Sequence, residues 1–198
     1  MAKEKMIEPI YNREYFSDRN EDLKNQHIKD ILDLIEFFKD VFNLKLYIGY
    51  GTLLGAIREH DFITHDKDID LVYISAYESK EQIKRELLFK IAEILKQYNM
   101  LVKDFNNRGQ LHVRVPNGSL VVDIFTSWIS NNMYNLVPFG ELCSKDIIYP
   151  FKSCLLRNAY FEIPNQSEVL LNILYKDWMN SIPKNENYLK LLKRNDLK

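Results

Sequence analysis

The chain has 198 residues, a length that suits one folded domain. Its 27 Lys and Arg and 28 Asp and Glu give a net charge of −1, which argues against the basic surface of a nucleic-acid-binding protein. No apolar run approaches a membrane span, and residues 1–5 do not resemble a signal peptide, so we expect a cytoplasmic protein. Cys143 and Cys154 lack metal-ligand spacing and are expected to be free thiols.

We expect one domain over residues 1–198, because the chain shows no internal repeat, low-complexity segment or linker. Residues 1–18 are expected to be irregular and partly mobile. Between Asn20 and Phe42, apolar residues recur mostly at steps of three and four, which predicts an amphipathic helix on a sheet.

A predicted strand over 44–49 leads into Gly51 and Thr52, which mark a turn from strand to helix. Glycine lets a ligand approach the main chain closely, and Thr52 is expected to cap the helix. Free backbone N–H groups at a helix start favour an anion such as phosphate. Such a Gly-Thr pair is common at turns, so the pattern alone has little weight.

Asp68 and Asp70 are separated by one residue in a predicted strand over 68–73. Alternation along a strand would put both carboxylates on one face, roughly 7 Å apart at Cα. Two carboxylates so placed can share one or two Mg²⁺ ions, and Asp66 is a further candidate ligand. A solvated pair on a strand edge is the alternative, but like charges on one face repel and usually need a cation.

A second amphipathic helix is predicted to begin near Ser79, which forms a capping-box pattern with Gln82. Its expected buried stripe comprises Ile83, Leu87, Ile91, Ile94 and Tyr98. Three strands should follow, joined by hairpin turns at 106–109 and 116–118: Leu101–Phe105, Leu111–Val115 and Leu120–Phe125.

Asp123 is a lone carboxylate within the apolar strand 120–125. Buried without a partner it would be costly, and a neighbouring strand carrying Asp68 and Asp70 would supply a shared metal. A buried Asp hydrogen-bonded to a turn is the alternative.

The region 127–156 is predicted to be loop-like and to form either the acceptor side of a cleft or simple packing. A helix follows from Gln166 to Tyr175, with Val169, Leu170 and Ile173 inward. Beyond Pro183 a short final helix is expected.

The order Gly-Thr-Leu-Leu-Gly-Ala-x-Arg, Phe-Ile and Asp-x-Asp-Ile-Asp over 51–70 resembles the LicD family, which includes fukutin and fukutin-related protein. Weaker matches follow at Val122–Phe125 and from Ile163 to Met179. The family usually has Gly, Pro and Trp at the positions of Asp61, Thr64 and His65, and often Gly at that of Lys176.

The resemblance implies an α+β fold with a nucleotidyltransferase-like mixed β-sheet flanked by helices. It also implies a phosphotransferase that moves phosphocholine or a polyol phosphate from a CDP-activated donor to a sugar hydroxyl. The acceptor would be a glycan or glycolipid of the cell surface, such as lipopolysaccharide or capsule. A nucleotidyltransferase acting on a small molecule or protein, and a non-catalytic binding module, are the alternatives.

In this scheme Mg²⁺ or Mn²⁺ is bound by Asp68, Asp70 and Asp123, with Asp66 as a further candidate, and Asp123 is the best-placed base. Gly51, Thr52 and Arg58 are the candidates for binding donor phosphates, and a structural ion pair is the alternative for Arg58. Roles for the remaining basic side chains near these motifs stay open: His60, His65, His112 and Arg114.

Overall fold

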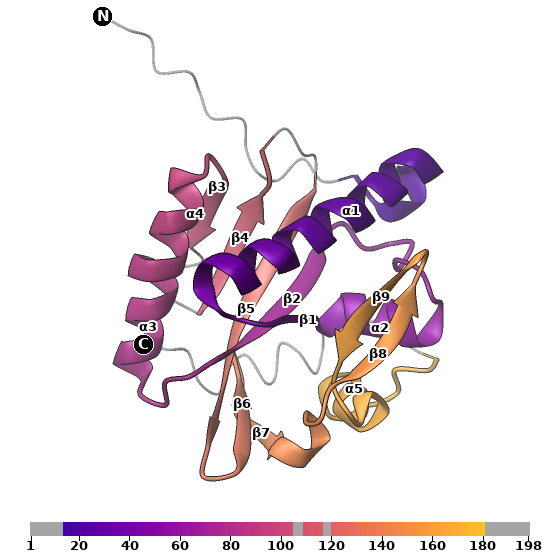
Figure 1. Cartoon of the computed structure of the whole chain (residues 1–198). Helices are drawn as coiled ribbons and strands as arrows, with labels where there is room; N and C mark the ends of the chain where they lie inside the picture. The colour runs from indigo at the N-terminus through magenta and orange to yellow at the C-terminus, as the bar shows by residue number, and fades with distance from the viewer. Residues whose placement is uncertain (1–13, 105–108, 117–119, 181–198) are drawn as a thin grey trace, which may run out of the picture.

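A mixed β-sheet forms the centre of the computed structural model, which describes residues 14–104, 109–116 and 120–180 (Figure 1). The elements are η1 Phe16–Asp18, α1 Glu21–Phe37, η2 Phe38–Phe42, β1 Leu46–Ile48, α2 Tyr50–Arg58, β2 Ile69–Ser75, α3 Lys80–Arg85, η3 Glu86–Ala92, α4 Glu93–Gln97, β3 Leu101–Asp104, β4 Gln110–Arg114, β5 Val121–Ser130, β6 Met133–Leu136, β7 Gly140–Ser144, η4 Lys145–Ile147, β8 Lys152–Leu156, β9 Ala159–Ile163 and α5 Ser167–Tyr175.

The strand order is β1-β2-β5-β4-β3, and β6 continues from β5 to pair with β7. Strands β2 and β5 run parallel, whereas β1, β4 and β6 run antiparallel to the strands beside them. Helix α1 crosses the sheet, and α2, α5 and the β8–β9 hairpin lie together at one side (Figure 1). The expected α+β fold with a mixed sheet flanked by helices is confirmed.

Both predicted amphipathic helices form, and each begins with a side-chain cap, of which the Ser79 cap was predicted. The Asn20 side chain accepts a hydrogen bond from the Leu23 N–H at 2.8 Å, and Ser79 accepts one from Gln82. Capping of this kind stabilises a helix because the first turn leaves backbone N–H groups without intrahelical partners.

The buried stripe of the second helix differs from the prediction. Three of the predicted positions are buried as expected: Ile83, Leu87 and Ile91. The next buried residue is Leu95, whereas Ile94 is only partly buried and Tyr98 is 54% exposed. The π-helical segment η3 explains the difference, since one extra residue in a turn moves the apolar stripe along by one position.

The region 127–156 is built largely of strands rather than the predicted loop. Strand β5 continues to Ser130, and β6, β7 and β8 follow it. Asn131 and Asn132 both adopt positive φ and close the β5–β6 hairpin, as is typical of a two-residue turn. The prediction for Val169 was also wrong, because it is exposed while Leu171 and Leu174 are buried.

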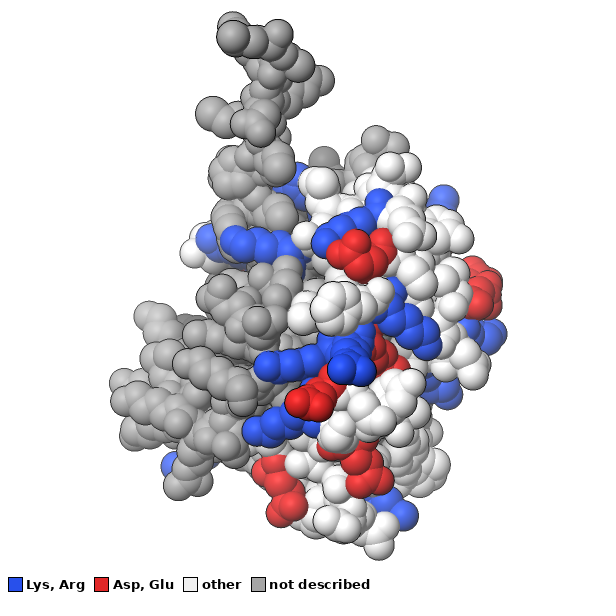
Figure 2. Space-filling model, turned by 90° about the vertical axis from the view of Figure 1, so that its left-hand side faces the viewer, with Lys and Arg blue, Asp and Glu red and all other residues white. Residues whose placement is uncertain are grey.

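Residues 14–18, expected to be irregular, contain the 3₁₀ turn η1 with a buried Phe16. The predicted irregularity of 1–13, the hairpin turns at 106–109 and 116–118, and the helix beyond Pro183 fall wholly or partly outside the described residues. In the described part of the chain, no helix is both long and apolar enough to span a bilayer. On the face shown in Figure 2, basic and acidic side chains are interspersed, in keeping with the net charge of −1.

Gly55 allows helix α2 to pack closely against the chain that follows it. A Cβ atom at this position would lie 2.5 Å from the Asp61 carbonyl oxygen and 3.2 Å from Cγ1 of Ile63. Replacing glycine by alanine inside a helix normally stabilises it by up to about 1 kcal/mol. Here we expect Gly55→Ala to lower the free energy of unfolding, because the clash is with backbone that cannot move aside.

Urea denaturation of Gly55→Ala and of Asn172→Ala, an exposed position in α5, would test this. The control should be neutral or slightly more stable than the parent. A higher midpoint for Gly55→Ala would contradict the packing described.

Candidate active site

The parallel strands β2 and β5 bring two aspartates side by side. Asp70 and Asp123 are partners in the strand register, so their side chains emerge on the same face of the sheet. Asp68 comes immediately before β2, because the strand begins at Ile69, one residue later than predicted. More than fifty residues separate Asp70 from Asp123 in sequence, and this pairing alone makes them neighbours.

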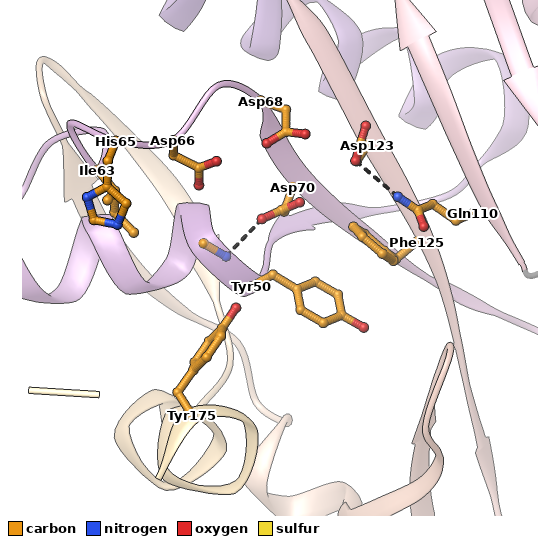
Figure 3. A pocket seen from close by; sticks show the side chains of 11 residues that line it. Tyr50, Ile63, His65, Asp66, Asp68, Asp70, Gln110, Asp123, Phe125 and Tyr175 are labelled. Atoms are coloured by element: carbon orange, nitrogen blue, oxygen red, sulfur yellow. Dashed lines mark hydrogen bonds between the residues drawn. The ribbon is translucent and has the colours of Figure 1, made fainter. Parts of the chain in front are cut away.

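A pocket of about 350 Å³ opens over these strands, and four of the residues that line it are aspartates. Figure 3 shows the carboxylates along one side of the pocket and aromatic rings along the other. The lining comprises Tyr50, Gly51, Ile63, His65, Asp66, Asp68, Asp70, Gln110, Asp123, Phe125 and Tyr175. The predicted carboxylates Asp66, Asp68, Asp70 and Asp123 therefore share one pocket.

The first turn of α2 forms two hydrogen bonds with Asp70. The Gly51 N–H donates a hydrogen bond of 2.8 Å to Oδ2 of Asp70, and the Asp70 N–H donates one of 2.8 Å to Oγ1 of Thr52. Thr52 was predicted to cap the helix, but the helix begins earlier, with Gly49 as its N-cap. A Cβ on Gly51 would lie 2.6 Å from Oδ2 of Asp66 and 3.1 Å from Oδ2 of Asp70, so a larger residue here would displace the Asp66 carboxylate.

Asp123 is held by two side chains of β4. Nε2 of Gln110 donates to its Oδ2 at 3.0 Å, and Nδ1 of His112 lies 2.9 Å from its Oδ1. Both His112 and Asp123 are buried. These contacts fix the direction of the Asp123 carboxylate.

The pocket concentrates negative charge. Burial raises the pKa of Asp70 well above its usual value, and the charges of Asp66 and Asp123 raise it further. The hydrogen bonds from the first turn of α2 act in the opposite direction. None of the described residues lining the pocket is Lys or Arg.

Clustered carboxylate oxygens are the donor set that Mg²⁺ and Mn²⁺ prefer, and this set fits such an ion chemically. Across the described ranges, however, no three His, Cys, Asp or Glu side chains are already grouped as a metal site.

The other predicted basic residues are distributed differently. His65 lines the pocket, whereas Arg58 lies at the far end of α2, where it bonds the Glu59 carboxylate and donates to the Trp178 carbonyl at 3.1 Å. His60 accepts a backbone hydrogen bond from Arg157, and Arg114 lies on β4 outside the pocket lining. The structure brings His65 and His112 to the carboxylates, and it does not bring Arg58, His60 or Arg114.

Sequence reasoning missed the aromatic side of the pocket. Tyr50 has a φ of 42°, which is uncommon for a residue with a large side chain and often marks functional sites. Its ring centre lies 4.3 Å from that of Phe125, and its hydroxyl donates to the Val137 carbonyl. Tyr175 reaches the same pocket from α5. The position of Tyr50 directly before Gly51 was the available signal.

The family model for LicD/FKTN/FKRP, nucleotidyltransferase domain, matches residues 43–166. The chain belongs to the LicD family. The match spans the pocket carboxylates from Asp66 to Asp123 together with the glycine turn before α2. Among curated proteins, no sequence match was found.

Solved structures with a similar fold are distant in sequence. The crystal structure of ANT(2'')-Ia in complex with adenylyl-2''-tobramycin has 14% identity and a TM-score of 0.49, covering 84% of this chain and 86% of that one. The STING-associated CdnE c-di-GMP synthase from Capnocytophaga granulosa has 14% identity and a TM-score of 0.44, covering 62% and 40%. Likenesses of this size carry no inference about the activity of the LicD-family chain.

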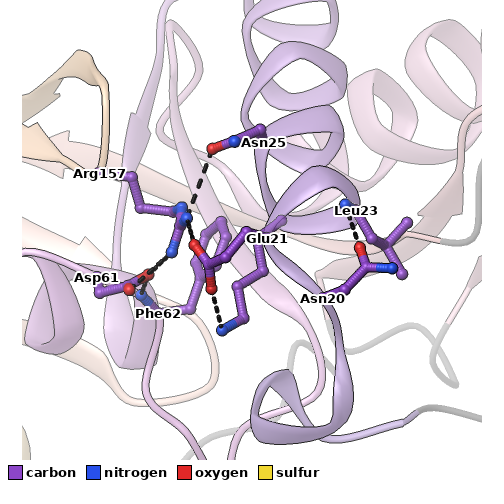
Figure 4. Close-up of polar contacts among 8 residues, drawn as sticks. Asn20, Glu21, Leu23, Asn25, Asp61, Phe62 and Arg157 are labelled. Atoms are coloured by element: carbon purple, nitrogen blue, oxygen red, sulfur yellow. Dashed lines mark hydrogen bonds and ion pairs between the residues drawn. The ribbon is translucent and has the colours of Figure 1, made fainter.

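At Asp61 and His65 this chain departs from the usual LicD pattern, and the structure shows what each side chain contacts or faces. Asp61 accepts two hydrogen bonds of 2.7 Å from Nη1 of Arg157 and so serves a structural contact (Figure 4). His65 instead faces the pocket, where the family usually has Trp. Of these two departures, only His65 lies in the pocket lining.

The negative charge of Asp70 should lower the free energy of unfolding of the metal-free protein. Because its pKa is raised in the folded state, the ionised form is disfavoured on folding, and the cost grows as pH rises above the unfolded value. We expect Asp70→Asn, in EDTA, to hold or raise the melting temperature, with a larger gain at pH 8 than at pH 5.

Asp33→Asn removes the same charge at an exposed site on α1. Its effect on the melting temperature should be nearly the same at pH 5 and pH 8. Circular dichroism melts of both variants give the comparison. A lower melting temperature for Asp70→Asn at pH 8 would contradict the mutual repulsion of the pocket carboxylates.

Proposed function

We propose that this LicD-family protein is a metal-dependent phosphotransferase acting in the cytoplasm. It moves a phospho-linked group, phosphocholine or a polyol phosphate, from a CDP-activated donor to a sugar hydroxyl. The acceptor is a cell-surface glycan or glycolipid of the lipopolysaccharide or capsule type. The observation that carries the proposal is the pocket shared by Asp66, Asp68, Asp70 and Asp123 in a chain of this family.

The carboxylates suit the binding of a pyrophosphate donor through a divalent cation. Asp68, Asp70 and Asp123 would hold Mg²⁺ or Mn²⁺, with Asp66 beside them. When bound, the ion would neutralise the donor pyrophosphate and stabilise charge on the departing nucleotide. The raised pKa of Asp70 supports this assignment, since a cation would remove the repulsion that raises it.

The first turn of α2 borders the same pocket through Tyr50 and Gly51. We propose that the Gly51 N–H and the Thr52 hydroxyl at this turn contact the phosphates of the donor. Arg58 is occupied at the other end of α2, so we assign it to the structural ion pair and not to the donor.

Asp123 is proposed to accept the proton of the attacking sugar hydroxyl. Gln110 and His112 orient the Asp123 carboxylate. The lone pairs that remain for accepting a proton therefore point in a fixed direction. The rings of Tyr50, Phe125 and Tyr175 offer the donor an apolar surface opposite the carboxylates.

Calorimetric titration with CDP-choline, CDP-ribitol, ATP, UTP and CTP, each with Mg²⁺, tests the donor. We expect CDP-linked compounds to bind and EDTA to abolish their binding. Tight binding of a nucleoside triphosphate alone would instead favour the nucleotidyltransferase alternative, and no nucleotide binding would favour a non-catalytic module.

Asp123→Ala should separate binding from catalysis. We expect it to retain CDP-donor binding while turnover falls by about 10²–10⁴-fold, the usual contribution of a general base. Release of CMP, followed by ³¹P NMR, gives the rate, and Asp33→Ala on the exposed side of α1 is the control. Unchanged turnover in Asp123→Ala, or loss in the control, would contradict the role.

A further inference from the structure

A short segment before α1 lies against the loop that carries the pocket aspartates. The Phe16 N–H donates to the Asp66 carbonyl at 2.8 Å, and the Ser17 N–H donates to the Thr64 carbonyl at 2.9 Å. We name residues 14–19 the strap. Its backbone is thus bonded directly to the chain on which Asp66 and Asp68 are placed, and it lies outside the pocket lining.

Arg19 joins the strap to this loop a second time. Its Nη2 donates to the Lys67 carbonyl at 2.8 Å and to the Glu14 carbonyl at 2.7 Å. The residue is only 7% exposed, and its guanidinium lies 4.3 Å from the centre of the Phe16 ring. The Lys67 carbonyl stands between Asp66 and Asp68 in sequence, so this contact fixes the backbone that separates them.

Phe16 anchors the strap in the core. Its ring is 2% exposed and stacks on that of Phe62, with ring centres 4.4 Å apart. His27 of α1 meets the same ring edge-on at 6.3 Å. Because Phe62 belongs to the same loop as Asp66, the strap holds the loop by stacking as well as by hydrogen bonds.

We infer that Arg19 is a positioning residue for the metal site, acting through the Lys67 carbonyl to set Asp66 and Asp68 relative to Asp70. The inference rests on the proposed function, in which these carboxylates bind a divalent cation. Groups that support metal ligands from behind typically contribute about 10- to 100-fold in metal affinity. Arg19 was not singled out by its sequence, since it belongs to no motif.

The direction in which the Mn²⁺ affinity changes distinguishes a positioning role of Arg19 from an effect of its charge. Arg19 carries a positive charge close to the acidic loop, and removing that charge alone would favour a cation in the pocket. Loss of positioning would weaken binding. A weaker ion affinity in an uncharged variant therefore cannot come from the charge.

Arg157 provides a matched control. It holds the beginning of the same loop through Asp61 and joins it to Glu21 and Asn25 of α1 (Figure 4). Its backbone N–H also donates to the His60 carbonyl at 2.8 Å. Replacing its side chain should therefore loosen the fold without releasing the carbonyl of Lys67.

The experiment measures Mn²⁺ affinity by electron paramagnetic resonance in the parent chain, Arg19→Met, Arg19→Lys and Arg157→Met. We expect Arg19→Met to bind Mn²⁺ at least about tenfold more weakly and Arg157→Met to stay within about threefold of the parent. Arg19→Lys keeps the charge and one donor, so it should recover part of the loss. Hydrogen exchange of the metal-free proteins should be faster over 63–68 in Arg19→Met only.

Equal or tighter Mn²⁺ binding by Arg19→Met, with the parent binding normally, would overturn the inference and leave the proposed function standing. An equal loss of Mn²⁺ affinity in Arg157→Met would also overturn the inference, because general loosening of the fold would then explain both losses. If the parent binds no Mn²⁺, the proposed function fails and the inference fails with it. Should Arg19→Met not fold, unchanged affinity in Arg19→Lys combined with unchanged exchange over 63–68 would overturn the inference.

Discussion

The parallel pairing of β2 with β5 is the constraint on which the site depends. It sets Asp70 opposite Asp123 in register, in a sheet whose faces are otherwise largely apolar around them. Two carboxylates so placed repel and lose hydration, and the raised pKa of Asp70 reflects both effects. Much of the local structure supports these carboxylates.

The support comes from three directions. The first turn of α2 donates to Asp70 through Gly51, the side chains of β4 hold Asp123, and the strap holds the loop that carries Asp66. Each contact limits how a carboxylate can turn, and none introduces a Lys or Arg side chain into the described pocket lining. In the proposed function, this orientation would lower the entropic cost of binding a metal ion and the donor.

The sequence was informative where one residue type had one dominant physical reason. The alternation around Asp68, Asp70 and Asp123 and the capping pattern at Ser79 are local sequence features, and the structure places these residues accordingly. Thr52 was misassigned because its hydroxyl bonds the Asp70 backbone, a tertiary contact that no local pattern reveals. The aromatic side of the pocket and Arg19 were missed for the same reason: their roles arise only when segments distant in sequence meet.

The central claim is that the carboxylates of β2 and β5 hold one divalent cation together. Anomalous diffraction from crystals grown with Mn²⁺ and CDP would test this most directly. We expect a peak in the pocket, with oxygens of Asp68, Asp70 and Asp123 each about 2.1 Å from the ion, a typical distance for a small hard cation. A pocket without an anomalous peak at saturating Mn²⁺, or an ion bound away from Asp123, would contradict the account.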